Sequence, residues 1–97
     1  MLAARVQKGL RLVIKRYGKW RVSRISLRKL DMHSSCDCVL GQLAGDYLVG
    51  KKAVGIEHEM GSLYGLSLTT GEIGSVPNAW DKLDTLWTRA IRRLRGE

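Results

Sequence analysis

The sequence predicts a mostly α-helical single domain over residues 1–97, a small three-helix bundle with a Gly-rich loop or short hairpin between the second and third helices. Apolar residues recur at helical spacing near both ends of the chain, and a third such pattern lies between them. A chain of 97 residues suits one domain with one modest core. Phe is absent, so three Trp and three Tyr supply all the aromatic packing.

The first helix is predicted over residues 2–17, and Gly18 ends it. Its apolar face carries Leu2, Val6, Leu10, Val13 and Tyr17. Residues 19–32 mix apolar spacings of two and three, so their structure is harder to assign. We expect either an extended stretch or a short turn of helix that lays Trp20 and Leu27 on the core.

The second helix is predicted to begin at Ser34 or Ser35, both good N-cap residues, and to end before Gly55. One face of this helix carries Val39, Leu40, Leu43, Tyr47 and Val54. Gly41 and Gly45 stand four residues apart, a spacing that indicates close approach to a neighbouring element.

Residues 56–77 are polar and Gly-rich and lack helical spacing. They are predicted to form either a hairpin that turns at Thr70-Gly71 or an ordered loop. The last helix is predicted after Pro77, with Asn78 as its N-cap. Its apolar stripe is the cleanest in the chain and comprises Trp80, Leu83, Trp87, Ala90, Ile91 and Leu94.

The formal net charge of +8 is concentrated in the first third of the chain. Residues 1–30 carry ten Lys and Arg and no acid, whereas residues 31–97 carry seven basic and nine acidic side chains. Such a block attracts polyanions such as nucleic acid, anionic lipid or an acidic protein face. The alternative interpretation is a solvated helix face that keeps the protein in solution.

A dense basic tract, with Tyr17 and Trp20 interleaved, is the candidate nucleic-acid-binding segment. Its cations are Lys15, Arg16, Lys19, Arg21, Arg24, Arg28 and Lys29. Lys and Arg neutralise phosphates, and an exposed ring can stack on a base. The pattern lacks two adjacent helices joined by a short turn with a basic second helix, so sequence-specific readout is not indicated.

Metal binding and catalysis are both disfavoured. His33, Cys36 and Cys38 form H-x2-C-x-C, and His58 is a fourth candidate ligand, but the paired knuckles of structural zinc sites are missing. No phosphate-binding Gly loop, HExxH or GxSxG motif is present. We therefore expect no metal, no cofactor and no enzymatic activity.

The expected compartment is the cytoplasm, and the expected state is soluble. A disulfide between Cys36 and Cys38 would close a strained ring, so we read both as reduced thiols. The longest charge-free stretch, residues 60–71, is too short and too rich in Gly, Ser and Thr to span a bilayer.

Residues 30–50, LDMHSSCDCVLGQLAGDYLVG, carry the one specific motif of the chain. This string resembles a family of small proteins of actinobacteriophages and actinobacteria, in which LD is followed by CVLGQLxGxYxxG. Further counterparts are Tyr64-Gly65-Leu66, with Leu66 in place of an aromatic residue, Trp87 and Arg92-Arg93. The resemblance implies a phage-type or actinobacterial cytoplasmic protein of a family of unknown function, and it implies no activity.

The motif also has a structural interpretation. Its members Cys38, Gly41 and Gly45 are small and allow a neighbouring segment to approach, and Tyr47 lies on the apolar face. Gln42 is a polar group among apolar residues. Once buried it needs hydrogen-bond partners, so we expect it to tie loop backbone to the bundle.

Together these features predict a non-enzymatic, phage-type accessory or regulatory protein of the bacterial host cytoplasm that acts by binding. Nucleic acid, contacted nonspecifically through phosphates, is the leading partner because the first third of the chain is so basic. The alternative is a protein-interaction module that captures a host protein, such as an acidic one, or that associates with itself as a homo-oligomer.

Overall fold

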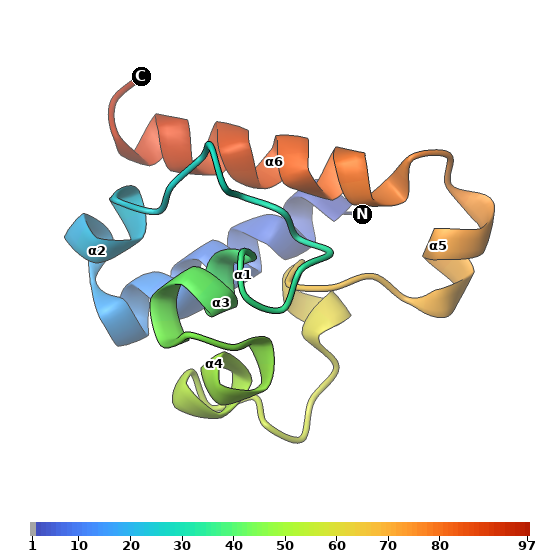
Figure 1. The fold of residues 1–97 in the computed structure, drawn as a ribbon, viewed down its shortest axis with the longest axis horizontal. Helices are drawn as coiled ribbons and strands as arrows, with labels where there is room; N and C mark the ends of the chain where they lie inside the picture. The colour runs from blue at the N-terminus through green and yellow to red at the C-terminus, as the bar shows by residue number, and fades with distance from the viewer. Residues whose placement is uncertain (1) are drawn as a thin grey trace.

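The computed structural model describes residues 2–97, and within them it has six α-helices, one 3-10 helix and no strand. The two longest helices are α1 (Leu2–Tyr17) and α6 (Ala79–Leu94), which pack against each other. The mostly α prediction is confirmed. The three-helix bundle is not, because the segment between α1 and α6 folds into several short helices (Figure 1).

The short helices surround the α1–α6 pair. In Figure 1, α2 (Lys19–Ser23) lies at one end and α5 (Thr70–Ser75) at the other. Helices α3 (Val39–Ala44) and α4 (Tyr47–Ala53) pack on each other on the side of α1 away from α6. The 3-10 helix η1 (Gly61–Tyr64) packs on α1. Among residues 2–97, no helix has the length and apolar character needed to cross a bilayer.

The bounds of α1 and α6 agree with the helical spacing of the sequence. Val6 and Val13 of α1 and Leu83, Trp87 and Ile91 of α6 are buried in one shared core. Trp87 also donates its indole N–H to the carbonyl of Gly65 at 2.6 Å, which satisfies the one polar atom of the buried ring. Asn78 holds the N-cap position of α6, but it has a left-handed φ of 52° and makes no side-chain cap bond.

The predicted second helix is two helices. Gly45 adopts a left-handed φ of 93° that ends α3, and Asp46 then caps α4 by accepting a hydrogen bond from Leu48 N at 2.8 Å. No atom lies within 4 Å of a Cβ built on Gly45, so its expected close approach is wrong. The N-cap of α3 is Cys38 rather than a serine; Ser34 instead accepts bonds from two amides of the preceding turn.

Gly41 does make the close approach that its size predicts. A Cβ on Gly41 would overlap the backbone of Cys36, in the loop that leads into α3. The neighbour is thus the chain's own loop rather than another helix.

Two further expectations are corrected. The hairpin at Thr70-Gly71 is wrong, because both residues lie in α5, which the capping box of Thr69 and Glu72 starts. Trp20 does not lie on the core. It is 71% exposed on α2, where Val22 takes the buried position, whereas Leu27 is half-buried against the core as expected.

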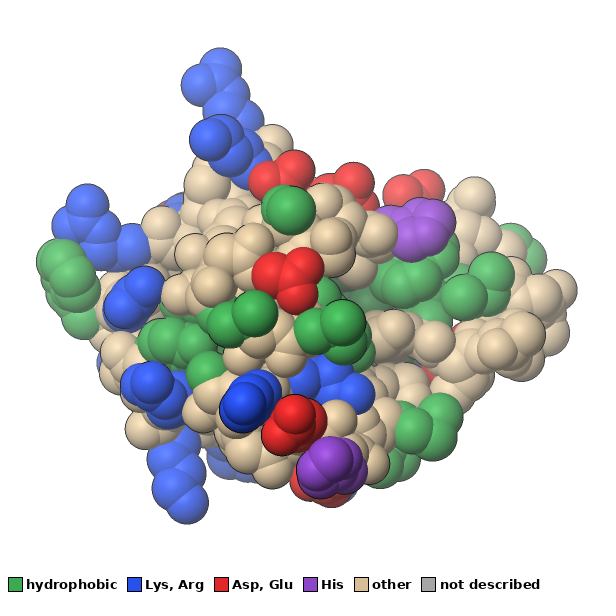
Figure 2. All heavy atoms as spheres, turned by 60° about the horizontal axis from the view of Figure 1, so that its bottom comes forward, with side chains coloured by type: hydrophobic (Ala, Val, Ile, Leu, Met, Phe, Trp, Pro, Cys, Tyr) green, Lys and Arg blue, Asp and Glu red, His purple; other side chains and the backbone are tan. Residues whose placement is uncertain are grey.

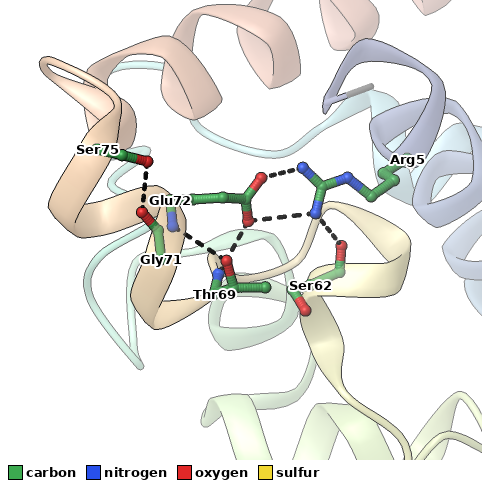
Figure 3. A network of polar contacts seen from close by, with 6 residues as sticks. All are labelled: Arg5, Ser62, Thr69, Gly71, Glu72 and Ser75. Carbon is green, nitrogen blue, oxygen red and sulfur yellow. Dashed lines mark hydrogen bonds and ion pairs between the residues drawn. The ribbon is translucent and has the colours of Figure 1, made fainter.

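Helix α5 is held to the body by a polar network. It has no buried residue of its own. Arg5 of α1 forms a bidentate ion pair with Glu72 and also donates to the carbonyl of Ser62 at 3.1 Å (Figure 3). Glu72 in turn accepts from the amide of Thr69 at 2.9 Å. One arginine therefore connects α1, η1 and α5.

This network makes stability depend on pH. The Arg5 hydrogen bonds, followed by the Thr69 amide, lower the pKa of Glu72 from 4.5 to about 2. A carboxyl with a depressed folded-state pKa stabilises the fold fully above its unfolded pKa, and it loses that contribution as the pH falls from about 4.5 toward about 2. At neutral pH, Glu72→Gln is expected to lower the free energy of unfolding by about 1–2 kcal/mol.

Urea titrations of wild type and Glu72→Gln at several pH values measure this contribution. The difference between the two proteins should shrink steadily as the pH falls below 4.5. The exposed Glu57→Gln serves as the control because its carboxylate pairs only with the exposed His58. A difference that stays constant from pH 7 to 2 would contradict the assignment.

Candidate nucleic-acid interface

The seven cations of the basic tract lie on three consecutive segments and are all exposed. Lys15 and Arg16 end α1, Lys19 and Arg21 lie on α2 with Arg24 as its C-cap, and Arg28 and Lys29 occupy the following turn. Because α1 packs on α2, and α2 on α6, these segments share one end of the molecule. Figure 2 shows Lys and Arg side chains gathered there, while the end that carries α5 is mostly uncharged.

Two of the seven cations already have backbone partners. Arg16 Nε donates to the carbonyl of Ala53 at 3.2 Å, at the end of α4. Arg21 Nη2 donates to the carbonyl of Leu43 at 3.0 Å, in the last turn of α3. A cation at a helix C-terminus meets the negative end of the dipole and unpaired carbonyls, so both side chains stabilise these short helices.

The end of α6 adds cations that sequence reasoning did not place here. Arg95 donates to the carbonyls of Ser23 and Ile25, each at 2.6 Å, and so joins the C-terminus of α6 to the end of α2. Arg92 and Arg93 are exposed on the preceding turn. The Arg-rich end of α6 was the available signal, but the sequence does not show that it meets α2. We call these three arginines and the seven predicted cations the basic end.

Carboxylates neutralise little of this charge. Within residues 2–97, the ion pairs with an N–O distance of 4.0 Å or less are Arg5–Glu72, Glu57–His58 and Arg95–Glu97. Nine of the ten cations of the basic end thus have no such partner in the described chain. An array of unpaired cations keeps its attraction for phosphates, since no internal ion pair must break before binding.

Two aromatic rings lie among these cations. The Tyr17 ring has the guanidinium carbons of Arg16 and Arg21 at 5.0 and 5.3 Å from its centroid. The Trp20 ring has that of Arg24 at 4.6 Å. These are cation–π distances. Tyr17 is half-buried and packs on the core, so Trp20 is the ring available to a ligand.

A surface groove of about 490 Å³ lies beside Trp20. It is lined by Trp20, Arg21, Arg24, Ile25, Gln42 and Leu43. Gln42 has the loop-tying hydrogen bonds expected of it: its amide nitrogen donates to the carbonyls of Ser26 at 3.0 Å and Asp37 at 3.1 Å, and its oxygen accepts from Ser26 N at 2.8 Å. The CVLGQL motif and the basic tract therefore meet at this groove.

The remaining motif residues build the scaffold behind the groove. Cys38 is buried and its sulfur accepts from the amide of Gly41 at 3.3 Å, while burial raises the pKa of its thiol. Burial likewise raises the pKa of Tyr47, the first residue of α4. Burial and the hydrogen bond from the Gly41 amide give Cys38 a structural place at the N-cap of α3.

The histidines and cysteines do not converge. His33 stacks on Trp80 with centroids 4.3 Å apart, Cys36 is exposed, and Cys38 is buried. In the part of the chain that the structure describes, no three His, Cys, Asp or Glu side chains are placed to hold a metal ion. Comparisons with protein-family models, curated proteins and solved structures find no match to this chain.

Proposed function

We propose that this chain is a non-enzymatic, phage-type accessory or regulatory protein that binds nucleic acid through the basic end. The observation that carries the proposal is the placement of exposed cations from α1, α2, the following turn and α6 at one end of the molecule, where Trp20 of α2 is also exposed. Nucleic acid combines dense negative charge with planar bases. The cations of the basic end complement the charge, and the exposed ring of Trp20 complements the bases. The likeness of residues 30–50 to actinobacteriophage proteins supports the phage-type role.

The proposed contacts are to phosphates and are independent of sequence. Helix α2 has five residues and is thus about 7.5 Å long, and its Val22 faces the core. Base readout in a major groove uses several side chains along one helix, which α2 is too short to present. Affinity should therefore fall steeply with salt, because each phosphate contact releases a counterion.

A salt titration with a matched pair of variants tests the proposal. Lys19→Gln/Arg28→Gln removes two exposed cations of the basic end, and Lys8→Gln/Lys82→Gln removes two exposed cations that lie outside it. Both double variants carry the same net charge. Fluorescence anisotropy with labelled DNA should give a log–log salt slope that is shallower by about two in the first variant and unchanged in the second.

Three results would contradict the proposal. They are no binding to duplex or single-stranded DNA at about 20 mM salt, where phosphate contacts are strongest, an affinity independent of salt, and equal losses in the two double variants. The first result would favour the alternative of a protein-interaction module. Exposed Leu48 and Val49 on α4 offer such a module an apolar contact surface.

A further inference from the structure

The groove beside Trp20 has both an apolar floor and a charged rim. Ile25 is buried at its base with Leu43, and Arg21 and Arg24 are exposed at its edge. A phosphate backbone alone needs cations and no apolar floor. The combination instead suits a ligand with a flat apolar face and a negative charge close by, which is the composition of one nucleotide.

Two sides of the groove are held in place without a ligand. Arg21 is hydrogen-bonded to the carbonyl of Leu43, and Gln42 uses both ends of its amide on the backbone of Ser26 and Asp37. A wall that is already ordered loses little conformational freedom on binding. Both N–H bonds of the Gln42 amide are engaged, so Gln42 cannot donate to the edge of a base.

Trp20 is the side of the groove that remains open to a stacking partner. Its side chain is 71% exposed, and one planar cation, the guanidinium of Arg24, already lies 4.6 Å from the ring centroid. Exposed tryptophan surface costs free energy in water, and a stacked base would cover it. Inside a duplex, each base face is covered by its neighbours and only the two end pairs have a free face, so away from the ends only an unpaired base can stack here without breaking a base pair.

We propose that the groove takes an unpaired base of single-stranded DNA or RNA, stacked on Trp20, while Arg24 and Lys19 contact the flanking phosphates. This inference rests on the proposed function and narrows its ligand to single strands. It predicts that the protein prefers a single strand to a duplex of the same length at equal salt. It also predicts that Trp20 is responsible for the preference for single strands. The cations of the basic end should instead supply the electrostatic affinity that single strands and duplexes share.

The test compares Trp20→Leu and Trp20→Tyr with wild type on three probes of one mixed sequence: single-stranded DNA, single-stranded RNA and blunt duplex DNA. Trp20→Leu is expected to lose about tenfold or more of its single-strand affinity, to keep its duplex affinity within about twofold, and to show less fluorescence quenching by the single strand. Trp20→Tyr should restore most of the single-strand affinity. Because Trp20 is so exposed, circular dichroism should show an unchanged fold in both variants.

The outcomes separate this inference from the proposed function. A selective single-strand loss in Trp20→Leu, rescued by tyrosine, supports it, and the DNA and RNA probes show which strand is held. Unchanged single-strand affinity in Trp20→Leu, or equal losses on duplex and single strand, overturns the stacking site. In that case Lys19→Gln/Arg28→Gln still reports on the basic end: a shallower salt slope preserves the proposed function. No binding of any probe by wild type overturns both.

Discussion

Trp87→Ala is expected to lower the free energy of unfolding by about 3–5 kcal/mol. The indole is fully buried between α1 and α6, and its N–H donates to the carbonyl of Gly65. Truncation leaves a cavity in the core and removes the side-chain donor of that carbonyl. Small domains have total stabilities near the lower end of about 5–15 kcal/mol, so much of the variant should be unfolded at 37 °C.

Urea denaturation followed by circular dichroism measures this loss. Trp87→Phe separates its two parts, because phenylalanine keeps most of the ring volume but leaves the Gly65 carbonyl without its donor. That variant should lose about 1–3 kcal/mol. The surface variant Trp20→Leu is the control and should unfold within about 0.5 kcal/mol of wild type. An unfolding midpoint of Trp87→Ala equal to that of the control would refute the central position of this ring.

Gly9→Ala is expected to destabilise the protein by about 2–4 kcal/mol, although alanine is the better helix former. Gly9 is buried in the middle of α1, where it faces η1. A Cβ there would overlap the carbonyl oxygen of Tyr64 and lie 3.1 Å from the Trp87 ring. A backbone carbonyl cannot rotate away as a side chain can, so α1 and η1 would have to separate.

Gly74→Ala provides the matched control for this prediction. Gly74 is also helical, in α5, but apart from the backbone of its own helix and its chain neighbours no atom lies within 4 Å of a Cβ built on it. At this position the higher helix propensity of alanine should act without a steric clash, so Gly74→Ala should raise the free energy of unfolding by about 0.5–1 kcal/mol. Thermal unfolding of both variants decides the matter: a Gly9→Ala protein as stable as Gly74→Ala would show that α1 and η1 are not in close contact.

The sequence predicted α1 and α6 well because each is long enough to show one continuous apolar stripe, which the fold buries. Leu83, Trp87 and Ile91 follow helical spacing, and the structure buries all three. The middle of the chain was harder, since its apolar residues pass from one short helix to the next. The break at Gly45 and Asp46 is a local cap signal that a shared apolar face over Val39–Val54 concealed.

The sequence predicted which charged residues form the candidate site, but it did not predict the hydrogen-bond partners of these residues. The seven cations of the tract are exposed, as a basic tract requires. That Arg16 and Arg21 bond helix ends depends on where α3 and α4 pack, which no local pattern reveals. Trp20 was assigned to the core because the chain has few large side chains. The competing signal was its place among five cations within residues 15–24.

The pairing of α1 with α6 also determines how this chain must fold. Their contacts join residues 2–17 to residues 79–94, so the α1–α6 contacts cannot form until the whole intervening segment has closed into a loop. Closure of so long a loop costs entropy before any core contact compensates for it, which slows folding relative to a bundle of sequential helices. During synthesis on the ribosome, the part of the α1 face that packs on α6 therefore stays uncovered until α6 has emerged, whereas α2 and η1 can cover their parts of α1 earlier.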